Sequence, residues 1–233
     1  KNVENESEKA VAVAKKGHTR DWVGIECSQA VKKGYFYAAA VCIFFSGFIL
    51  QSVTGVSSVH MRDIGIDPAF VATVTSIGSV LLALSKFLTG FLYDKCGLRF
   101  TIASTSISAV LIMVLLLFLS NSIEGRVLCV IYSAVSALAL PLETVMLPII
   151  TAELFGERSY SKMLGIVTAV STAGYSTGPI IMNLCFDAFG SYDYAFIGAA
   201  MLMVVVAVGL QVVISVARRE RARVEAELVT VNE

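Results

Sequence analysis

The sequence predicts an all-α membrane protein, a bundle of six transmembrane helices, and two observations lead to that fold class. The chain has 233 residues, of which 56% are hydrophobic and only 15% are charged, whereas a soluble domain usually carries about 25% charged residues. The hydrophobic residues also gather in six blocks, each near or above the ~20 residues that cross a bilayer as a helix. These blocks are Tyr35–Ser58, Ala69–Tyr93, Phe100–Leu119, Val127–Thr151, Met163–Phe186 and Tyr194–Val216.

The positive charges predict the orientation of these spans. Of the 18 Lys and Arg residues, 15 lie before the first span, after the last, or in the turns that follow the second and fourth spans. The opposite loops hold only Arg62 and Arg126. Because cytoplasmic loops are enriched in Lys and Arg, residues 1–34 and 217–233 are predicted to be a cytoplasmic linker and a basic cytoplasmic tail. The polar start of the chain, which is not a Met, leads us to expect a further segment upstream.

The first span carries polar residues at helical spacing, among them Gln51 and Thr54. The second span carries a charge, Lys86, in a row of small residues. Small residues mark a face on which another helix packs closely, so Lys86 is predicted to point into protein or a cavity. The alternative is a lysine that extends along the lipid-facing surface to the inner interface. The small residues of the row are Ala72, Ser76, Ser79, Ala83 and Gly90.

The fourth span contains a carboxylate, Glu143, between Pro141 and Pro148. An ionisable residue inside a membrane span is expensive and is taken as a functional-site hypothesis. Glu143 lies ten residues before Glu153, much as Lys86 lies eight before Asp94, so the two internal charges are expected at similar depth. An ion pair between them is possible on this geometry. A role in transport and a purely structural role remain equally open for Glu143.

The fifth span has a polar face that includes Tyr175 and a close-packing pattern, Gly174-x-x-x-Gly178, followed by Pro179. Polar stripes are nearly absent from the third span, which has small hydroxyls only at its start, and from the sixth, so the pattern repeats every three helices. An Asp-x-x-Gly sequence ends both the second span (94–97) and the fifth (187–190). With three spans in each unit, the two copies lie on opposite sides of the membrane. This arrangement predicts a 3+3 inverted repeat, which in transporters surrounds a binding site near the midplane.

In the turn that follows the second span, the residues resemble those of a known family. Gly90–Arg99 reads GFLYDKCGLR and is similar to the loop motif of the major facilitator superfamily, G-x-x-x-D-[RK]-x-G-[RK]-[RK], with Leu98 at one basic position. The segments 178–196 and 153–160 resemble the monocarboxylate and oxalate/formate porters of that superfamily. The resemblance covers nearly all of residues 25–216. It implies that the chain corresponds to helices 7–12, half of a 12-helix fold, and that a six-helix N-terminal half completes it.

The resemblance also implies roles for individual residues. Lys86 occupies the position, four residues before the motif glycine, where the monocarboxylate porters have an arginine that contacts the substrate carboxylate. A lysine keeps the positive charge but lacks the two-pronged geometry of arginine. Some of these porters carry a proton-coupling aspartate four residues earlier, where this chain has Leu82. Because the oxalate porter's lysine also has no counterpart in the fifth span, Glu143 is left as the candidate for proton coupling.

The loop motif itself implies a conformational role. Asp94 is expected to interact with the positive N-terminal end of the fifth span near Ser161, while cytoplasmic acids would pair with the basic residues. Such a contact would favour one state of an alternating-access cycle over the other. The residues to which this role is assigned are Gly90, Asp94, Lys95, Gly97 and Arg99.

The sequence therefore predicts a plasma-membrane secondary transporter of small organic anions, proton-coupled or exchanging, with Lys86, Gln51, Thr54 and Tyr175 at the substrate. Its expected partners are a small-molecule substrate, the N-terminal half and the bilayer, and not nucleic acid. No enzyme, cofactor or metal site is predicted, because no nucleophile–base or metal-ligand spacing is recognised. Two alternatives remain: an exporter of neutral solutes or drugs, and a six-helix membrane scaffold that does not transport.

Overall fold

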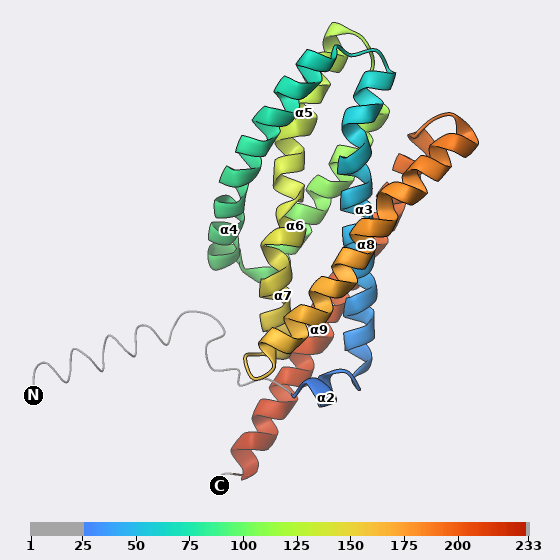
Figure 1. Ribbon diagram of the computed structural model, residues 1–233. Coiled ribbons are helices and arrows are strands. Elements are labelled where there is room, and N and C mark those ends of the chain that lie inside the picture. Colours follow the sequence, from blue (N-terminus) through green and yellow to red (C-terminus); the bar gives the residue numbers. More distant parts are fainter. Residues whose placement is uncertain (1–25, 232–233) are drawn as a thin grey trace, which may run out of the picture.

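A computed structural model describes residues 26–231, with side chains as far as residue 222. Within that range every regular element is a helix (Figure 1). Residues 1–25 of the predicted linker lie outside the described part. The helices are α2 (Cys27–Ala30), α3 (Gly34–Asp63), α4 (Pro68–Leu117), α5 (Ile123–Ala139), α6 (Pro141–Thr144), α7 (Met146–Phe155), α8 (Tyr160–Phe189) and α9 (Asp193–Val231).

Four stretches of the described chain are long and apolar enough to cross a membrane, which indicates a multi-pass membrane protein. These stretches are α3, α4, the continuous run Ile123–Phe155 that contains α5 to α7, and Asp193–Ala222 of α9. The helix α8 covers the predicted fifth span but is not among them, because hydroxyl-bearing residues lower its hydropathy. The number of six spans and the inverted repeat therefore stay predictions.

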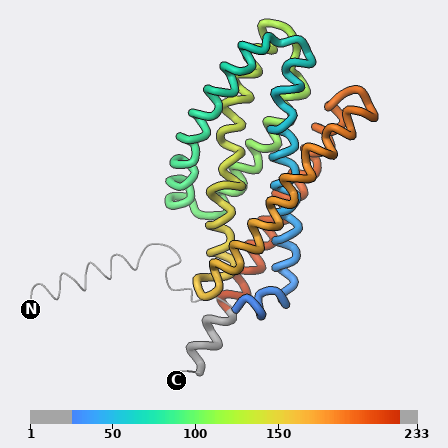
Figure 2. Tube along the Cα trace, viewed as in Figure 1, coloured from blue at the N-terminus to red at the C-terminus, as the bar shows by residue number. Residues whose placement is uncertain are grey.

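The 50-residue helix α4 is not straight. At Gly97 the backbone leaves the helical region, with φ 80° and ψ 172°, and the chain reverses direction (Figure 2). A positive φ of this kind is adopted readily only by glycine. The first arm, up to Gly97, and the second arm, after it, correspond to the predicted second and third spans.

The ends of the helices follow local sequence signals. Asp67 caps α4 by accepting a hydrogen bond from the Phe70 amide at 3.1 Å, and Pro68 occupies the first helical position. Both features are typical of helix starts, where backbone N–H groups lack partners. Gly156 and Gly190, with φ of 75° and 72°, end α7 and α8. Glycine is favoured there because it accepts a positive φ without strain.

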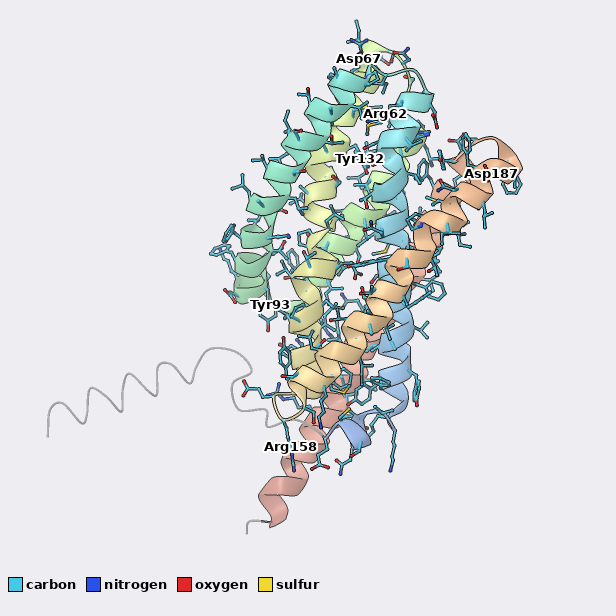
Figure 3. The ribbon with its side chains drawn as sticks, viewed as in Figure 1. Arg62, Asp67, Tyr93, Tyr132, Arg158 and Asp187 are labelled. Carbon is cyan, nitrogen blue, oxygen red and sulfur yellow. The ribbon has the colours of Figure 1, made fainter. Side chains whose placement is uncertain are left out.

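The helices pack as two main pairs, α3 with α8 and α4 with α5, and α9 packs against both α4 and α3. Figure 3 shows Arg158 toward the lower end of the bundle, Tyr93 at about mid-height where the first arm of α4 ends, and Arg62, Asp67 and Asp187 toward the upper end. At the lower end Arg158 pairs with Glu26 at 2.7 Å, and Lys33 pairs with Glu220 at 2.8 Å. These two ion pairs attach α9 and the α7–α8 loop to the residues that precede α3.

Candidate functional site

Glu143 lies buried, with 6% of its surface exposed, where three segments of the chain meet. Its Oε1 atom accepts a hydrogen bond from the Ser46 hydroxyl of α3. Its Oε2 atom accepts one from Ser171 at 2.8 Å and one from Tyr175 at 3.1 Å, both on α8. Hydrogen bonds to an ionised acceptor are stronger than neutral ones, so these three hydroxyls offset part of the cost of burying a carboxylate. Through these hydrogen bonds the Glu143 carboxyl group links α6 to α3 and α8.

The helix break around Glu143 follows from the prolines. Proline has no N–H group and cannot bond to the carbonyl four residues earlier, so Pro141 leaves the Ala137 carbonyl without its helical partner. The Ser85 hydroxyl of α4 donates a hydrogen bond to that carbonyl. The chain then continues as the four-residue helix α6 and resumes as α7 at Met146. The break places Glu143 in a short segment between two longer helices.

A second polar region is a cavity of about 180 Å³ between α3, α4 and α5. Hydroxyl groups from all three helices line it, and none of the described side chains around it carries a formal charge. Ser133 reaches across from α5 to donate a hydrogen bond to the Val74 carbonyl of α4 at 2.9 Å. The hydroxyl-bearing residues at the cavity are Thr54, Ser57, Ser58, Thr75, Ser79, Tyr132, Ser133 and Ser136.

The predicted substrate residues do not form one pocket. Tyr175 belongs to the Glu143 cluster, whereas Thr54 lines the hydroxyl cavity and donates its hydroxyl to the Leu50 carbonyl at 2.7 Å. Gln51 and Lys86 are exposed. Within the described residues Lys86 makes no ion pair, so the pairing with Glu143 that the sequence left open is not formed in this structure.

The face of α4 that carries Lys86 is open in the structure. Its small residues Ala72, Ser76, Ser79 and Ala83 are exposed, as is Phe87 with 80% of its surface. A neighbouring face of the helix, through residues such as Val74, Ser85 and Thr89, is the one buried against the other helices. The small-residue row is therefore not a contact between helices within the described part of the chain.

The residues of the loop motif lie where α4 turns at Gly97. Tyr93 donates a hydrogen bond to Glu153 of α7 at 3.0 Å, Arg99 donates to the Ser215 hydroxyl, and Gln211 donates to the Arg99 carbonyl at 2.8 Å. The turn is thus attached to α7 and α9. Asp94 is exposed, and the contact that we expected with the N-terminal end of α8 is not formed among the described residues. Lys95 lies over the Phe91 ring, 6.0 Å from its centre.

The glycines of α8 lie at its crossing with α3. A methyl group at Gly174 would come within 2.3 Å of the Phe44 carbonyl oxygen, and one at Gly178 within 2.5 Å of the Phe48 carbonyl oxygen. Pro179 lies beside Gly55, at 3.6 Å from the position that a Cβ atom would occupy there. This close approach brings Ser46 and Ser171 together around Glu143.

Sequence reasoning missed Ser46 and did not single out Ser171. A usable signal existed for Ser171, which lies three residues before Gly174 and four before Tyr175, on the helix face that the glycines define. No comparable signal exists for Ser46, a lone serine in an aromatic-rich stretch. Its role follows only from the packing of α3 against α8.

The comparisons with known proteins bear on the family. Residues 39–229 match the Major Facilitator Superfamily, so the match extends from α3 into the C-terminal part of α9. No curated protein matches the chain in a sequence comparison. Since the family match covers most of the 233 residues, the chain belongs to the major facilitator superfamily.

Proposed function

We propose that the protein is a secondary active transporter of small organic anions, of the monocarboxylate or oxalate/formate type, working by alternating access. Members of the superfamily are membrane transporters rather than enzymes, and the family match supports a transport function for this chain. The anionic substrate and the proton coupling or exchange are the proposal. The observation that carries the proposed proton-coupled transport is Glu143, a buried carboxylate that accepts hydrogen bonds from three hydroxyls on two other helices.

Proton coupling requires a group whose protonation changes the relative stability of two conformations. Glu143 meets this requirement because its carboxylate accepts hydrogen bonds from α3 on one side and α8 on the other. A protonated carboxyl group would be a weaker acceptor for these hydroxyls. Protonation would therefore loosen the junction of α3, α6 and α8, and proton release would tighten it.

The anionic substrate is proposed from Lys86. A lysine at hydrocarbon depth is costly and usually faces protein or a water-filled cavity, and Lys86 is exposed on the open face of α4. We propose that this face turns toward a companion six-helix half and that Lys86 attracts the substrate charge there. Gln51, Thr54 and Tyr175 would contribute hydrogen bonds, and the residues around Gly97 would bias the conformational equilibrium. The proposed setting is the plasma membrane, with both ends of the segment in the cytoplasm.

Uptake of radiolabelled monocarboxylates and dicarboxylates by the full-length protein in proteoliposomes tests the substrate site. We expect Lys86→Gln to lower anion uptake at least about tenfold, because the substrate charge loses its partner. The matched control is Lys162→Gln, an exposed cation near the start of α8, which should leave uptake unchanged. Unchanged transport of every anion by Lys86→Gln would remove the anion site from the proposal.

The same vesicles test the proton carrier. Glu143→Gln keeps the shape of the side chain but cannot exchange a proton, so uptake driven by a pH gradient should be abolished while substrate exchange persists. Glu124→Gln, at an exposed position in the first turn of α5, is the control. Survival of both gradient-driven uptake and exchange in Glu143→Gln would leave Glu143 with a structural role only.

One observation favours a second candidate, transport of a neutral solute. The cavity of about 180 Å³ between α3, α4 and α5 is lined by hydroxyls and by no charged residue among those described. Such a lining suits a small uncharged molecule that donates hydrogen bonds, because most of these hydroxyls already donate their own protons to backbone carbonyls. Uptake of polyols or neutral amides that is insensitive to Lys86→Gln, together with no anion uptake, would favour this candidate.

A further inference from the structure

A long groove runs between the second arm of α4 and α9, and none of its lining residues has a role in the proposed transport function. Its volume is about 630 Å³. Aliphatic side chains make up most of its walls, such as Ile107 and Val110 on α4 and Val204 and Val208 on α9. The groove residues extend from Ala103 to Val114 on one helix and from Val204 to Ser215 on the other.

One end of the groove adjoins a polar pocket of about 360 Å³ at the turn of α4, lined by Arg99, Arg218, Glu153 and Tyr93, among others. Gln211 and Ser215 line the groove and also bind Arg99: Gln211 donates to its carbonyl at 2.8 Å, and its guanidinium donates to the Ser215 hydroxyl. Arg99 therefore lies at the junction of the aliphatic groove and the arginine pocket.

The groove also contains a polar atom that lacks a hydrogen-bond partner in the part of the chain that the structure describes. Ser106 lines the groove with 1% of its surface exposed, and among the described residues its hydroxyl oxygen makes no hydrogen bond. Other hydroxyls in this bundle, such as those of Thr101 and Thr105, bond to carbonyls of their own helix. A buried hydroxyl without a partner is costly, and the Ser106 hydroxyl is suited to bind a polar group of an occupant.

We propose that the groove and the adjoining arginine pocket together bind one anionic phospholipid. The lipid phosphate would lie between Arg99 and Arg218, its glycerol ester region near Ser106 and Gln211, and an acyl chain between the valines of the two helices. The pocket favours an anion because it holds two guanidinium groups and one carboxylate, that of Glu153, which already accepts the Tyr93 hydroxyl.

The length of the groove matches the acyl-chain region of one bilayer leaflet. Groove residues on each helix span eleven positions, or about 16 Å at 1.5 Å per residue. Half of a typical bilayer's hydrocarbon core is about 15 Å thick. The two arginines lie at the end of the bundle where α9 continues into the C-terminal residues, the end that we expect to face the cytoplasm. Anionic lipids are concentrated in the cytoplasmic leaflet.

Photolabelling of the full-length protein tests this site. The protein would be reconstituted in phosphatidylcholine vesicles with a trace of lipid that carries a photoreactive diazirine on its acyl chain. The headgroup of this probe would be either phosphatidylglycerol or phosphatidylcholine, and labelled residues would be mapped by mass spectrometry. We expect the anionic probe to label groove residues at least about fivefold more than the zwitterionic probe, since one arginine near a membrane surface accounts for about that factor.

Matched variants separate the two parts of the site. Arg218→Gln should lower the preference for the anionic probe about fivefold, whereas Arg219→Gln, an exposed neighbour outside both cavities, should not. Val208→Phe should fill the groove and remove its labelling by the anionic probe. Val205→Phe should not, because Val205 is similarly exposed on the same helix but does not line the groove.

Equal labelling of the groove by the two probes would show ordinary boundary lipid and overturn the proposal. The proposal would also be overturned by equal effects of Arg218→Gln and Arg219→Gln, or of Val208→Phe and Val205→Phe. Crosslinks across the groove between two copies of the protein would assign it to an interface instead.

Discussion

Replacing Gly174 by alanine should destabilise the protein, although alanine is the better helix former. In the interior of α8 the substitution alone would favour the helix by about 1 kcal/mol. At this position, however, the new methyl group would lie 2.3 Å from the Phe44 carbonyl oxygen and 2.9 Å from the Phe48 amide nitrogen. Both are backbone atoms of α3, so neither can rotate out of the way. Relief requires the two helices to separate.

Overpacking of this kind costs about 1–3 kcal/mol, and the rigid neighbours place Gly174→Ala in the upper part of that range. Subtracting the gain in helix propensity leaves the folded protein about 1–2 kcal/mol less stable. Gly165→Ala is the matched control, because Gly165 lies on the same helix with no atom within 4 Å of the added Cβ. Gly165→Ala should raise the free energy of unfolding by up to about 1 kcal/mol. The two variants should therefore differ in stability by about 2–3 kcal/mol.

Thermal unfolding of the purified protein, followed by circular dichroism in one detergent, measures the difference. For a protein of this size 1 kcal/mol shifts the midpoint by about 2–4 °C, so we expect Gly165→Ala to melt about 5–10 °C above Gly174→Ala. Equal midpoints, or a higher midpoint for Gly174→Ala, would show that α3 and α8 do not meet at this glycine.

Two further predictions concern the turns. Gly97→Ala should lower stability by about 1–3 kcal/mol, because a side chain at φ 80° and ψ 172° is strained although nothing crowds it. Gly90→Ala should not lower stability, because Gly90 is equally uncrowded and its backbone is helical. Thermal unfolding of the two variants measures the difference. Burial and the carboxylates of Asp63 and Asp187 raise the pKa of Tyr192, so the unfolded chain loses this proton first and stability falls as the pH rises above about 10. Tyr192→Phe should therefore lose less stability at alkaline pH, as measured by thermal unfolding at a series of pH values. If the variant and the unmodified protein lose stability equally, Tyr192 is not the group responsible.

The sequence was most informative where a single residue type has a local physical consequence. Gly97, Gly156 and Gly190 end or turn helices because glycine accepts a positive φ. Asp67 with Pro68 begins a helix because this pair suits its first turn. Each of these signals acts within four residues, so no knowledge of the tertiary structure was needed to read it.

The surroundings of Glu143 were not predictable in the same way. The position of the carboxylate in an apolar span could be read directly, but its partners Ser46 and Ser171 come from helices 97 and 28 residues away. Which hydroxyl faces the carboxylate depends on how α3 and α8 cross. The same limit applies to Asp94, whose expected contact with α8 depends on the relative placement of two helices that are not neighbours in this structure.

The hydroxyl groups on the polar faces of α4 and α8 also find hydrogen-bond partners within their own helices. Exposed hydroxyls on α8 donate to carbonyls four residues earlier, as Thr172 does to Thr168 at 2.8 Å and Ser176 to Thr172 at 3.0 Å. Ser76 and Ser79 on α4 do the same. A hydroxyl bonded in this way has its donor satisfied within the helix. A polar stripe in a span is therefore weaker evidence for a substrate site than its residue types imply.

Lys86 differs from these hydroxyls, because no backbone carbonyl of its own helix neutralises a charge. Glu143 has three donors around it, while Lys86 lies among exposed Leu84, Phe87 and Leu88. A lysine that merely extended toward the inner interface would need no special neighbours, since its stem covers part of the about 12 Å of helix to Asp94. A lipid-facing position for Lys86 would leave the row of small residues on the same face unexplained, because lipid does not select for small side chains. The row and the charge together favour a second protein surface opposite this face, with Lys86 at the cavity between the two.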